Sequence, residues 1–182
     1  MVSGTQNSSI AMLAEFRDMV ERAGAESILC DLPSLPGHLH ALRERDPAWH
    51  LGLSQEIRTL LPNLSSLERR SPDWPEICVG RGMFGIAATG TVVMAEATYT
   101  DRLAALLCVR HVVVLPGGAL IDTWSDAAPI LRGWLGRGTG RYVTFVTGPS
   151  RTSDIERVLT IGVHGPRELA VLVVEGWQPD GA

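Results

Sequence analysis

The chain has 182 residues, of which 45% are apolar and 20% charged, and this balance suits one globular domain with a substantial core. Its formal net charge is −4, so no overall basic field draws it to nucleic acid or to an anionic membrane. No run approaches the roughly 18 apolar residues of a membrane helix, and the polar start MVSGTQNSS lacks the pattern of a signal peptide. We therefore expect a cytoplasmic protein that does not insert into a membrane.

The N-terminal part begins with an amphipathic helix and continues into a proline-rich region. Apolar residues at helical spacing predict a helix over 9–23, which Gly24 can end, and a short strand over Ser27–Leu32. Residues 33–75 hold six prolines and predict short helices and loops that lie over a sheet. Because no carboxylate or cysteine lies at ligand spacing from the histidines of this region, we predict no metal site there. These histidines are His38, His40 and His50.

From Glu76 onward, short apolar runs alternate with helical patterns. The predicted strands are Ile77–Gly80, Gly85–Ala88, Thr91–Ala95, His111–Leu115, Tyr142–Thr147 and Leu169–Val174. Three helices are predicted here. The first is capped by Asp101, the second covers about 126–136, and the third covers about 153–159. Buried strands that alternate with helices indicate a three-layer α/β/α domain with a mostly parallel sheet, in which ligands lie beyond the carboxyl ends of the strands. We expect residues 1–182 to form a single domain.

The composition excludes several kinds of chemistry. The three cysteines, Cys30, Cys78 and Cys108, are far apart in the sequence, which argues against a disulfide framework or a cysteine-held metal cluster and predicts buried free thiols. All 16 basic residues other than histidine are arginines, so a lysine Schiff base and a P-loop are excluded. We assign no cofactor, because no dinucleotide-binding fingerprint is recognised.

The first candidate site is the segment GPSRTSDIE, residues 148–156. A strand ends just before it, and Ser153 and Glu156 have the spacing of a capping box. Free amide donors at the helix start, together with Gly148, Ser150, Arg151 and Thr152, can hold a phosphate or carboxylate. The alternative is a well-capped junction that binds nothing, because acidic residues in the first turn already satisfy the helix dipole.

Two further turns complete the set of candidates. His164 lies between Gly162 and Gly165 and can act as a general acid or base, with Glu156 as a second such group; the alternative is a turn histidine bonded to a carbonyl. Ala87–Thr91 is a turn of small residues in which Thr89, Gly90 and Thr91 allow the backbone to approach a ligand. The alternative there is a plain hairpin turn.

These segments carry a family resemblance. GPSRTSDIE followed by GVHGP, with GIAATGTVVM upstream, resembles the LUD-domain family over roughly residues 77–175, and residues 1–75 match it only weakly. The resemblance implies the fold of the glucosamine-6-phosphate isomerase, ribose-5-phosphate isomerase and CoA-transferase superfamily. It also implies a place in a system that oxidises L-lactate to pyruvate, in which iron–sulfur partner proteins carry the redox centres.

One residue departs from the family pattern. The family commonly has a glutamate in the AETGT turn where this chain has Ala88, and CoA-transferase relatives use a glutamate as nucleophile, so covalent CoA transfer at that position is not expected. The first hypothesis is a component of a lactate-oxidising assembly without redox centres, which binds a small anionic or nucleotide-like ligand. The second is a stand-alone isomerase or transferase acting on a phosphorylated or acyl metabolite. The third is a diverged domain whose cleft is inactive and which serves protein–protein contact.

Overall fold

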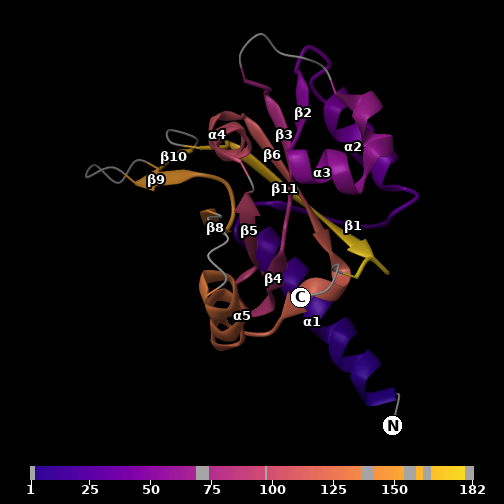
Figure 1. Cartoon of the computed structure of the whole chain (residues 1–182), viewed down its shortest axis with the longest axis vertical. Coiled ribbons are helices and arrows are strands. Elements are labelled where there is room, and N and C mark those ends of the chain that lie inside the picture. Colours follow the sequence, from indigo (N-terminus) through magenta and orange to yellow (C-terminus); the bar gives the residue numbers. More distant parts are fainter. Residues whose placement is uncertain are drawn as a thin grey trace.

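A five-stranded, fully parallel sheet forms the centre of the fold (Figure 1). The structure, a computed structural model, describes residues 3–68, 74–96, 98–136, 142–153, 159–161 and 165–178. The strand order is β1-β11-β6-β3-β2. The strands are β1 (Glu26–Asp31), β2 (Leu51–Leu53), β3 (Ile77–Arg81), β6 (Arg110–Pro116) and β11 (Glu168–Glu175).

The two central strands are apolar along most of their length because both of their faces are covered. β6 is buried at every position, and β11 is buried from Leu169 to Val174. Successive side chains point to opposite faces, so Val112 and Val114 enter one core while Val113 and Leu115 enter the other. This explains why the strands read as continuous valine and leucine runs rather than as an alternating pattern.

Short helices from the proline-rich region cover the first face of the sheet. They are α2 (Leu35–Glu44), α3 (Gln55–Leu60) and the 3₁₀ helix η1 (Pro62–Leu67). Leu35, Leu39 and Leu42 lie on one side of α2 and are almost completely buried in the core against this face. Residues 33–75 thus form short helices over the sheet, as predicted, except that residues 51–53 form β2 and belong to the sheet itself.

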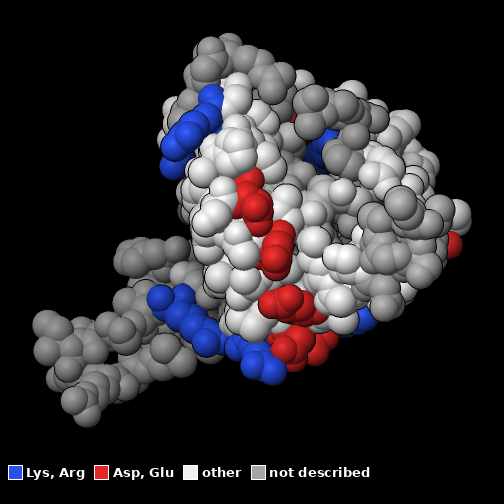
Figure 2. Space-filling view, turned by 90° about the horizontal axis from the view of Figure 1, so that it is seen from below, with Lys and Arg blue, Asp and Glu red and all other residues white. Residues whose placement is uncertain are grey.

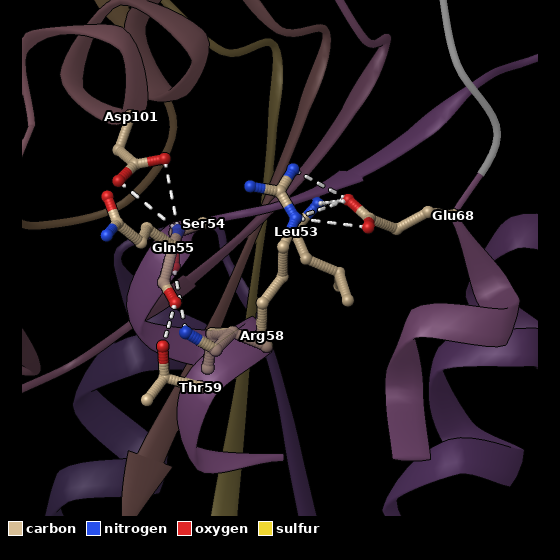
Figure 3. A network of polar contacts seen from close by, with 8 residues as sticks. Leu53, Ser54, Gln55, Arg58, Thr59, Glu68 and Asp101 are labelled. Carbon is tan, nitrogen blue, oxygen red and sulfur yellow. Dashed lines mark hydrogen bonds and ion pairs between the residues drawn. The ribbon is translucent and has the colours of Figure 1, made fainter. Parts of the chain in front are cut away.

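A polar network fixes the position of α3 (Figure 3). The Ser54 hydroxyl accepts a hydrogen bond from the Ile57 amide and caps the helix. The Gln55 amide donates to the carboxylate of Asp101 at 3.2 Å, which ties α3 to the next helix in space, and Arg58 forms an ion pair with Glu68 at 2.8 Å. Ser54 and Asp101 also line the smaller of the two hollows that are described below.

The second face of the parallel sheet is covered by one long helix and by a second sheet. Helix α1 (Ser3–Arg22) inserts Phe16 and Val20 into the core on this side, and strand β5 (Thr91–Glu96) adds Val92 and Met94. We had expected helices alone on this face. The difference arises because the glycine-separated runs between residues 84 and 96 pair with each other as a hairpin instead of joining the parallel sheet.

The second sheet has the order β7-β4-β5-β8 and is mostly antiparallel. Its other strands are β4 (Phe84–Ile86), β7 (Leu120–Ile121) and β8 (Tyr142–Val146). The short 3₁₀ helices η2 (Ala87–Thr89) and η3 (Gly117–Ala119) precede β5 and β7. Helix α5 (Trp124–Gly136) packs on the outer side of this sheet, where Trp134 contacts Phe84.

Two details of the prediction are corrected. Helix α4 (Tyr99–Leu107) is capped by Thr98, whose hydroxyl accepts from the Asp101 amide at 3.0 Å, so Asp101 lies inside the first turn rather than at the cap. A helix is predicted over 153–159, but its first residue belongs to strand β9 (Arg151–Ser153) and its last residue to strand β10 (Leu159–Ile161). The two strands pair antiparallel and project from the side of the molecule (Figure 1). Residues 154–158 lie outside the described residues.

Other predictions are confirmed. The three-layer α/β architecture with a mostly parallel main sheet is present, and the helix predicted over 9–23 lies within α1. Cys30, Cys78 and Cys108 are buried and free. In the described part of the chain, no helix is long and apolar enough to cross a membrane. The single-domain organisation of the whole chain stays a prediction.

Candidate functional site

Two loops that are distant in the sequence meet beside the parallel sheet. The Ser150 amide donates a hydrogen bond of 2.9 Å to the Pro166 carbonyl. Gly165 has a φ of 144°, and a Cβ at this position would lie 3.1 Å from Cβ of Ser150, so the two loops are in close contact. The loop after residue 147 and the loop before residue 168 are thus packed against each other.

A hollow of about 430 Å³, counted out to its opening, lies beneath these loops. Its polar groups come from different elements, with Glu96 at the end of β5, Arg102 on α4, His111 on β6 and Thr144 on β8. Its remaining lining is small or apolar and consists of Ala105, Leu106, Val146, Gly148, Pro149, Ser150, Pro166 and Leu169. An apolar hollow with a few convergent polar groups is typical of a small-molecule site.

The hollow lies beside the first residues of the central strands and not beyond their carboxyl ends. His111 is the second residue of β6 and Leu169 the second of β11, and the two are register partners. The loop after β8 lies at this end because β8 does not belong to the parallel sheet. β8 pairs antiparallel with β5, so the loop that follows it is delivered to the opposite end of the parallel strands.

Glu96 is a buried carboxyl group at this site. Its residue is only 8% exposed, and burial raises the pKa of the Glu96 carboxyl above its ordinary value. A hydrogen bond of 3.3 Å from the Thr144 hydroxyl and the positive charge of Arg102 oppose this shift. The carboxyl group is thus adapted to hold a proton more readily than an exposed glutamate does.

His111 presents an unpaired ring nitrogen. The residue is 3% exposed, and its buried Nε2 atom has no hydrogen-bond partner. Burial lowers the pKa of His111 to about 4, so the imidazole is neutral near pH 7. A Cβ at Gly80 would lie 3.3 Å from this nitrogen, so Nε2 faces the backbone of β3.

A second, smaller hollow adjoins the first one. The two share Glu96, Ala105 and His111, and the second continues along β3 past Cys78 and Gly80 to Arg81. The Nε atom of Arg81 is also buried without a partner. Cys78 does not act as a nucleophile here, because its hydrogen bond with Cys108 and its burial hold the pKa of the Cys78 thiol well above its ordinary value.

The predicted turn around Thr89, Gly90 and Thr91 lies against α1 and does not line either hollow. It forms the hairpin between β4 and β5. The Thr91 hydroxyl is 2.8 Å from that of Thr89 and 2.7 Å from that of Thr147, so three hydroxyls connect this turn to the end of β8. Ala88 donates its amide to the Asp122 carbonyl at 3.0 Å.

The remaining candidate residues divide into three groups. Gly148 and Ser150 line the larger hollow. Arg151 does not line it; its Nη2 donates to the Ala23 carbonyl at 2.8 Å, and the backbone of Thr152 pairs with Thr160 in the β9–β10 hairpin. His164 and Glu156 lie outside the described residues. The ligand-binding and catalytic roles of these residues stay predictions.

Sequence reasoning missed the two polar residues that define the site. Glu96 ends the apolar run TVVMAE, and His111 begins the run HVVVL. A charged or titratable residue at the boundary of a fully buried strand is the signal that identifies both. Gly80, Gly82 and Gly85 have the G-x-G-x-x-G spacing, but they run from the end of β3 into β4 rather than from a strand into a helix, so they do not form a dinucleotide fingerprint.

The buried imidazole leads to a testable pH dependence of stability. The pKa of His111 is about 4 in the folded chain, whereas an ordinary histidine, as in the unfolded chain, has a pKa of 6.5. The unfolded chain therefore binds this proton more tightly. The contribution of the neutral His111 imidazole to the free energy of unfolding is therefore complete above pH 6.5 and is lost as the pH falls toward 4. Between about pH 7 and pH 4, we expect the unmodified chain to lose on the order of 3 kcal/mol more free energy of unfolding than His111→Gln does.

Urea unfolding at a series of pH values measures this difference. The matched control is His40→Gln, because His40 is exposed on α2 and its substitution should leave the pH dependence of the unmodified chain unchanged. Equal pH dependence in the unmodified chain and in His111→Gln would contradict the prediction.

The fold and this hollow define the class of protein: an α/β domain in which a parallel sheet and a smaller, mostly antiparallel sheet both line a hollow. The LUD domain family model matches residues 25–174, so this chain belongs to the LUD domain family. In the described part of the chain, no three His, Cys, Asp or Glu side chains are grouped as a metal site.

Similar proteins agree with this assignment. Lactate utilization protein C of Bacillus licheniformis is 33% identical over 92 residues, which are 50% of this chain and 38% of that protein. The protein of the same name from Geobacillus thermodenitrificans is 30% identical over 115 residues, or 60% of this chain and 48% of that protein. This chain thus spans less than half of the length of these two curated relatives.

A solved structure shows the same fold. The crystal structure of a DUF162 family protein from Deinococcus radiodurans superimposes with a TM-score of 0.69 at 20% sequence identity. The match covers 91% of this chain and 98% of the other.

Proposed function

We propose that this chain acts in lactate utilization as a component without redox centres of its own, and that it binds a small anionic or nucleotide-like ligand in the larger hollow. The observation that carries the role is family membership, together with several relatives of about 30% identity that are named lactate utilization protein C. The hollow beneath Gly148 and Ser150 supports the ligand, because both residues belong to the segments that resemble the family.

The cysteine content supports the proposal that other proteins carry the redox centres. Three cysteines are fewer than the four thiolates that usually hold an iron–sulfur cluster. All three are buried, and burial raises the pKa of Cys30 to about 11. We therefore assign the electron-carrying step to iron–sulfur partner proteins of a lactate-oxidising complex.

The charge of the surface is compatible with a metabolic partner rather than with nucleic acid. Figure 2 shows a row of acidic side chains across the face seen from below, with basic side chains toward the edges of that face. Such an acidic row repels a polyanion such as DNA or RNA from this face.

Deletion of the gene in the organism that encodes this chain tests the proposed role. We expect the deletion strain to lose growth on L-lactate as the sole carbon source, because lactate oxidation stops, while growth on pyruvate is unchanged. Growth curves on the two carbon sources and the lactate remaining in the medium provide the measurement. A plasmid copy of the gene should restore growth on lactate, and normal lactate consumption by the deletion strain would contradict the proposal.

A further inference from the structure

Strand β8 forms an open edge of the second sheet. It pairs with β5 on one side, and within the described ranges no strand pairs with its other side (Figure 1). The free side of an edge strand carries a row of backbone N–H and C=O groups that can pair with another strand. The occupant that matches such an edge is therefore an extended backbone.

The other edges of the two larger sheets are protected, whereas β8 is not. Strand β7 has only two residues. Strand β2 has three, and the Leu53 amide donates at 2.9 Å to the carboxylate of Glu68. Strand β1 carries an acidic residue at each end, Glu26 and Asp31. Short length, side-chain caps and charges keep natural edges from pairing. The five residues of β8, YVTFV, include neither a charge nor a proline.

Aromatic side chains gather at this edge. Tyr142, Phe145 and Trp124 are each between 43% and 48% exposed, and the ring centroids of Trp124 and Phe145 are 5.2 Å apart. Phe145 is the register partner of Val93, whose side chain enters the core beside α5, so Phe145 points to the outer face of the sheet. Exposed aromatic residues are enriched at the centres of protein interfaces.

A second copy of β8 is complementary to this edge. Along an antiparallel pair, every second residue directs its N–H and C=O toward the partner strand. When a strand pairs with itself, the numbers of two opposite residues must therefore add to an even number. The pairing that uses all five residues places Thr144 opposite Thr144 of the second copy, on a two-fold axis. Because β8 is uncharged, this symmetry brings no like charges together along the strand.

We propose that two copies of this chain associate through antiparallel pairing of their β8 strands, about a two-fold axis at Thr144. Closed two-fold dimers of this kind are the commonest oligomers of soluble proteins. The two second sheets then join into one continuous sheet. On the outer face, Phe145 of each copy lies opposite Val143 of the other, which removes Phe145 from water.

The pairing also brings the second copy to the larger hollow. Val146 lines this hollow, and Tyr142 of the second copy lies opposite Val146 on the same face of the joined sheet. The second copy thus contributes an aromatic side chain to the rim of the hollow. The inference does not depend on the proposed metabolic role, which a monomer and a dimer could equally fulfil.

Analytical ultracentrifugation of the full chain at a series of concentrations tests the association. We expect a species with twice the mass of one chain. Phe145→Lys should raise its dissociation constant at least about tenfold, because a charge then lies in the joint opposite an apolar residue. Ile10→Lys is the matched control, since Ile10 is 66% exposed on α1 and should leave the dimer unchanged. A monomer at all concentrations, or equal effects of the two substitutions, would overturn the proposal.

Cysteine cross-linking tests the register independently. Thr144→Cys should give a disulfide-linked dimer under mild oxidation, because directly opposite Cβ atoms lie roughly 5 Å apart. Tyr142→Cys should not, because the two copies of residue 142 are separated by about 13 Å along the strands. The unmodified chain, whose described cysteines are buried, gives the background on a non-reducing gel. If Phe145→Lys does not fold, this result decides alone: a cross-link in Tyr142→Cys, or none in Thr144→Cys, would overturn the proposal.

Discussion

The substitution Gly90→Ala is expected to destabilise the protein by roughly 2–5 kcal/mol, the sum of backbone strain and overpacking. Gly90 has a φ of 62°, in the left-handed region that disfavours other residues. A Cβ at this position would lie 2.5 Å from the Val20 amide nitrogen and 2.6 Å from the Met19 carbonyl carbon, which belong to the backbone of α1. Backbone atoms inside a helix cannot move away cheaply. Urea unfolding of the variant and the unmodified chain measures the loss.

Gly176→Ala is the matched control for this experiment. Gly176 has a similar φ of 69°, but a Cβ there would meet no atom within 4 Å. The control should lose only the strain of the left-handed backbone, about 1–2 kcal/mol. Equal losses for the two variants would show that the contact between Gly90 and α1 is not tight.

A second large effect is expected for Arg110→Met, which should cost about 2–4 kcal/mol of free energy of unfolding. Arg110 is 5% exposed and donates to the Leu42 carbonyl at 2.8 Å and to the Glu168 carboxylate at 2.6 Å. Its third partner is Asp46 at 3.0 Å. Methionine keeps most of the volume but leaves the carbonyl without its donor. Chemical denaturation gives the difference.

Arg45→Met is the control for Arg110→Met. Arg45 forms an ion pair with Glu26 at 2.6 Å, but both side chains are exposed. Exposed pairs of this kind contribute about 0–1 kcal/mol, because water and salt screen them. A loss in the Arg45 variant as large as in the Arg110 variant would contradict the view that burial makes Arg110 important.

The main features of the fold could be predicted from local sequence patterns. The valine and leucine runs of β6 and β11, and the helical spacing of Phe16 and Val20 in α1, indicate buried strands and an amphipathic helix by themselves. Pairing between strands could not be predicted in the same way. The run over residues 142–147 has the composition of a parallel strand, and only its contacts with β5 place it in a second sheet.

The candidate site was predictable only in part for the same reason. Glycine and proline near residues 148 and 166 indicated the two loops that meet. Glu96 and His111 come together only because two sheets face each other, and no sequence spacing relates positions on different sheets. Gly90 packs against the backbone of α1, and Gly148 lies close to Ala23, directly after α1, while it also lines the larger hollow.

The C-terminal end of α1 has a consequence for the segment that lines the larger hollow. A Cβ at Gly148 would collide with the Ala23 carbonyl, and Arg151 donates to that same carbonyl, so the segment that roofs the hollow is anchored on the last turn of the first helix. Fraying of the helix end would loosen both of these contacts and free the segment around Gly148. The stability of the end of the amino-terminal helix therefore bears on the position of Gly148, which lines the larger hollow, although no residue of α1 lines that hollow.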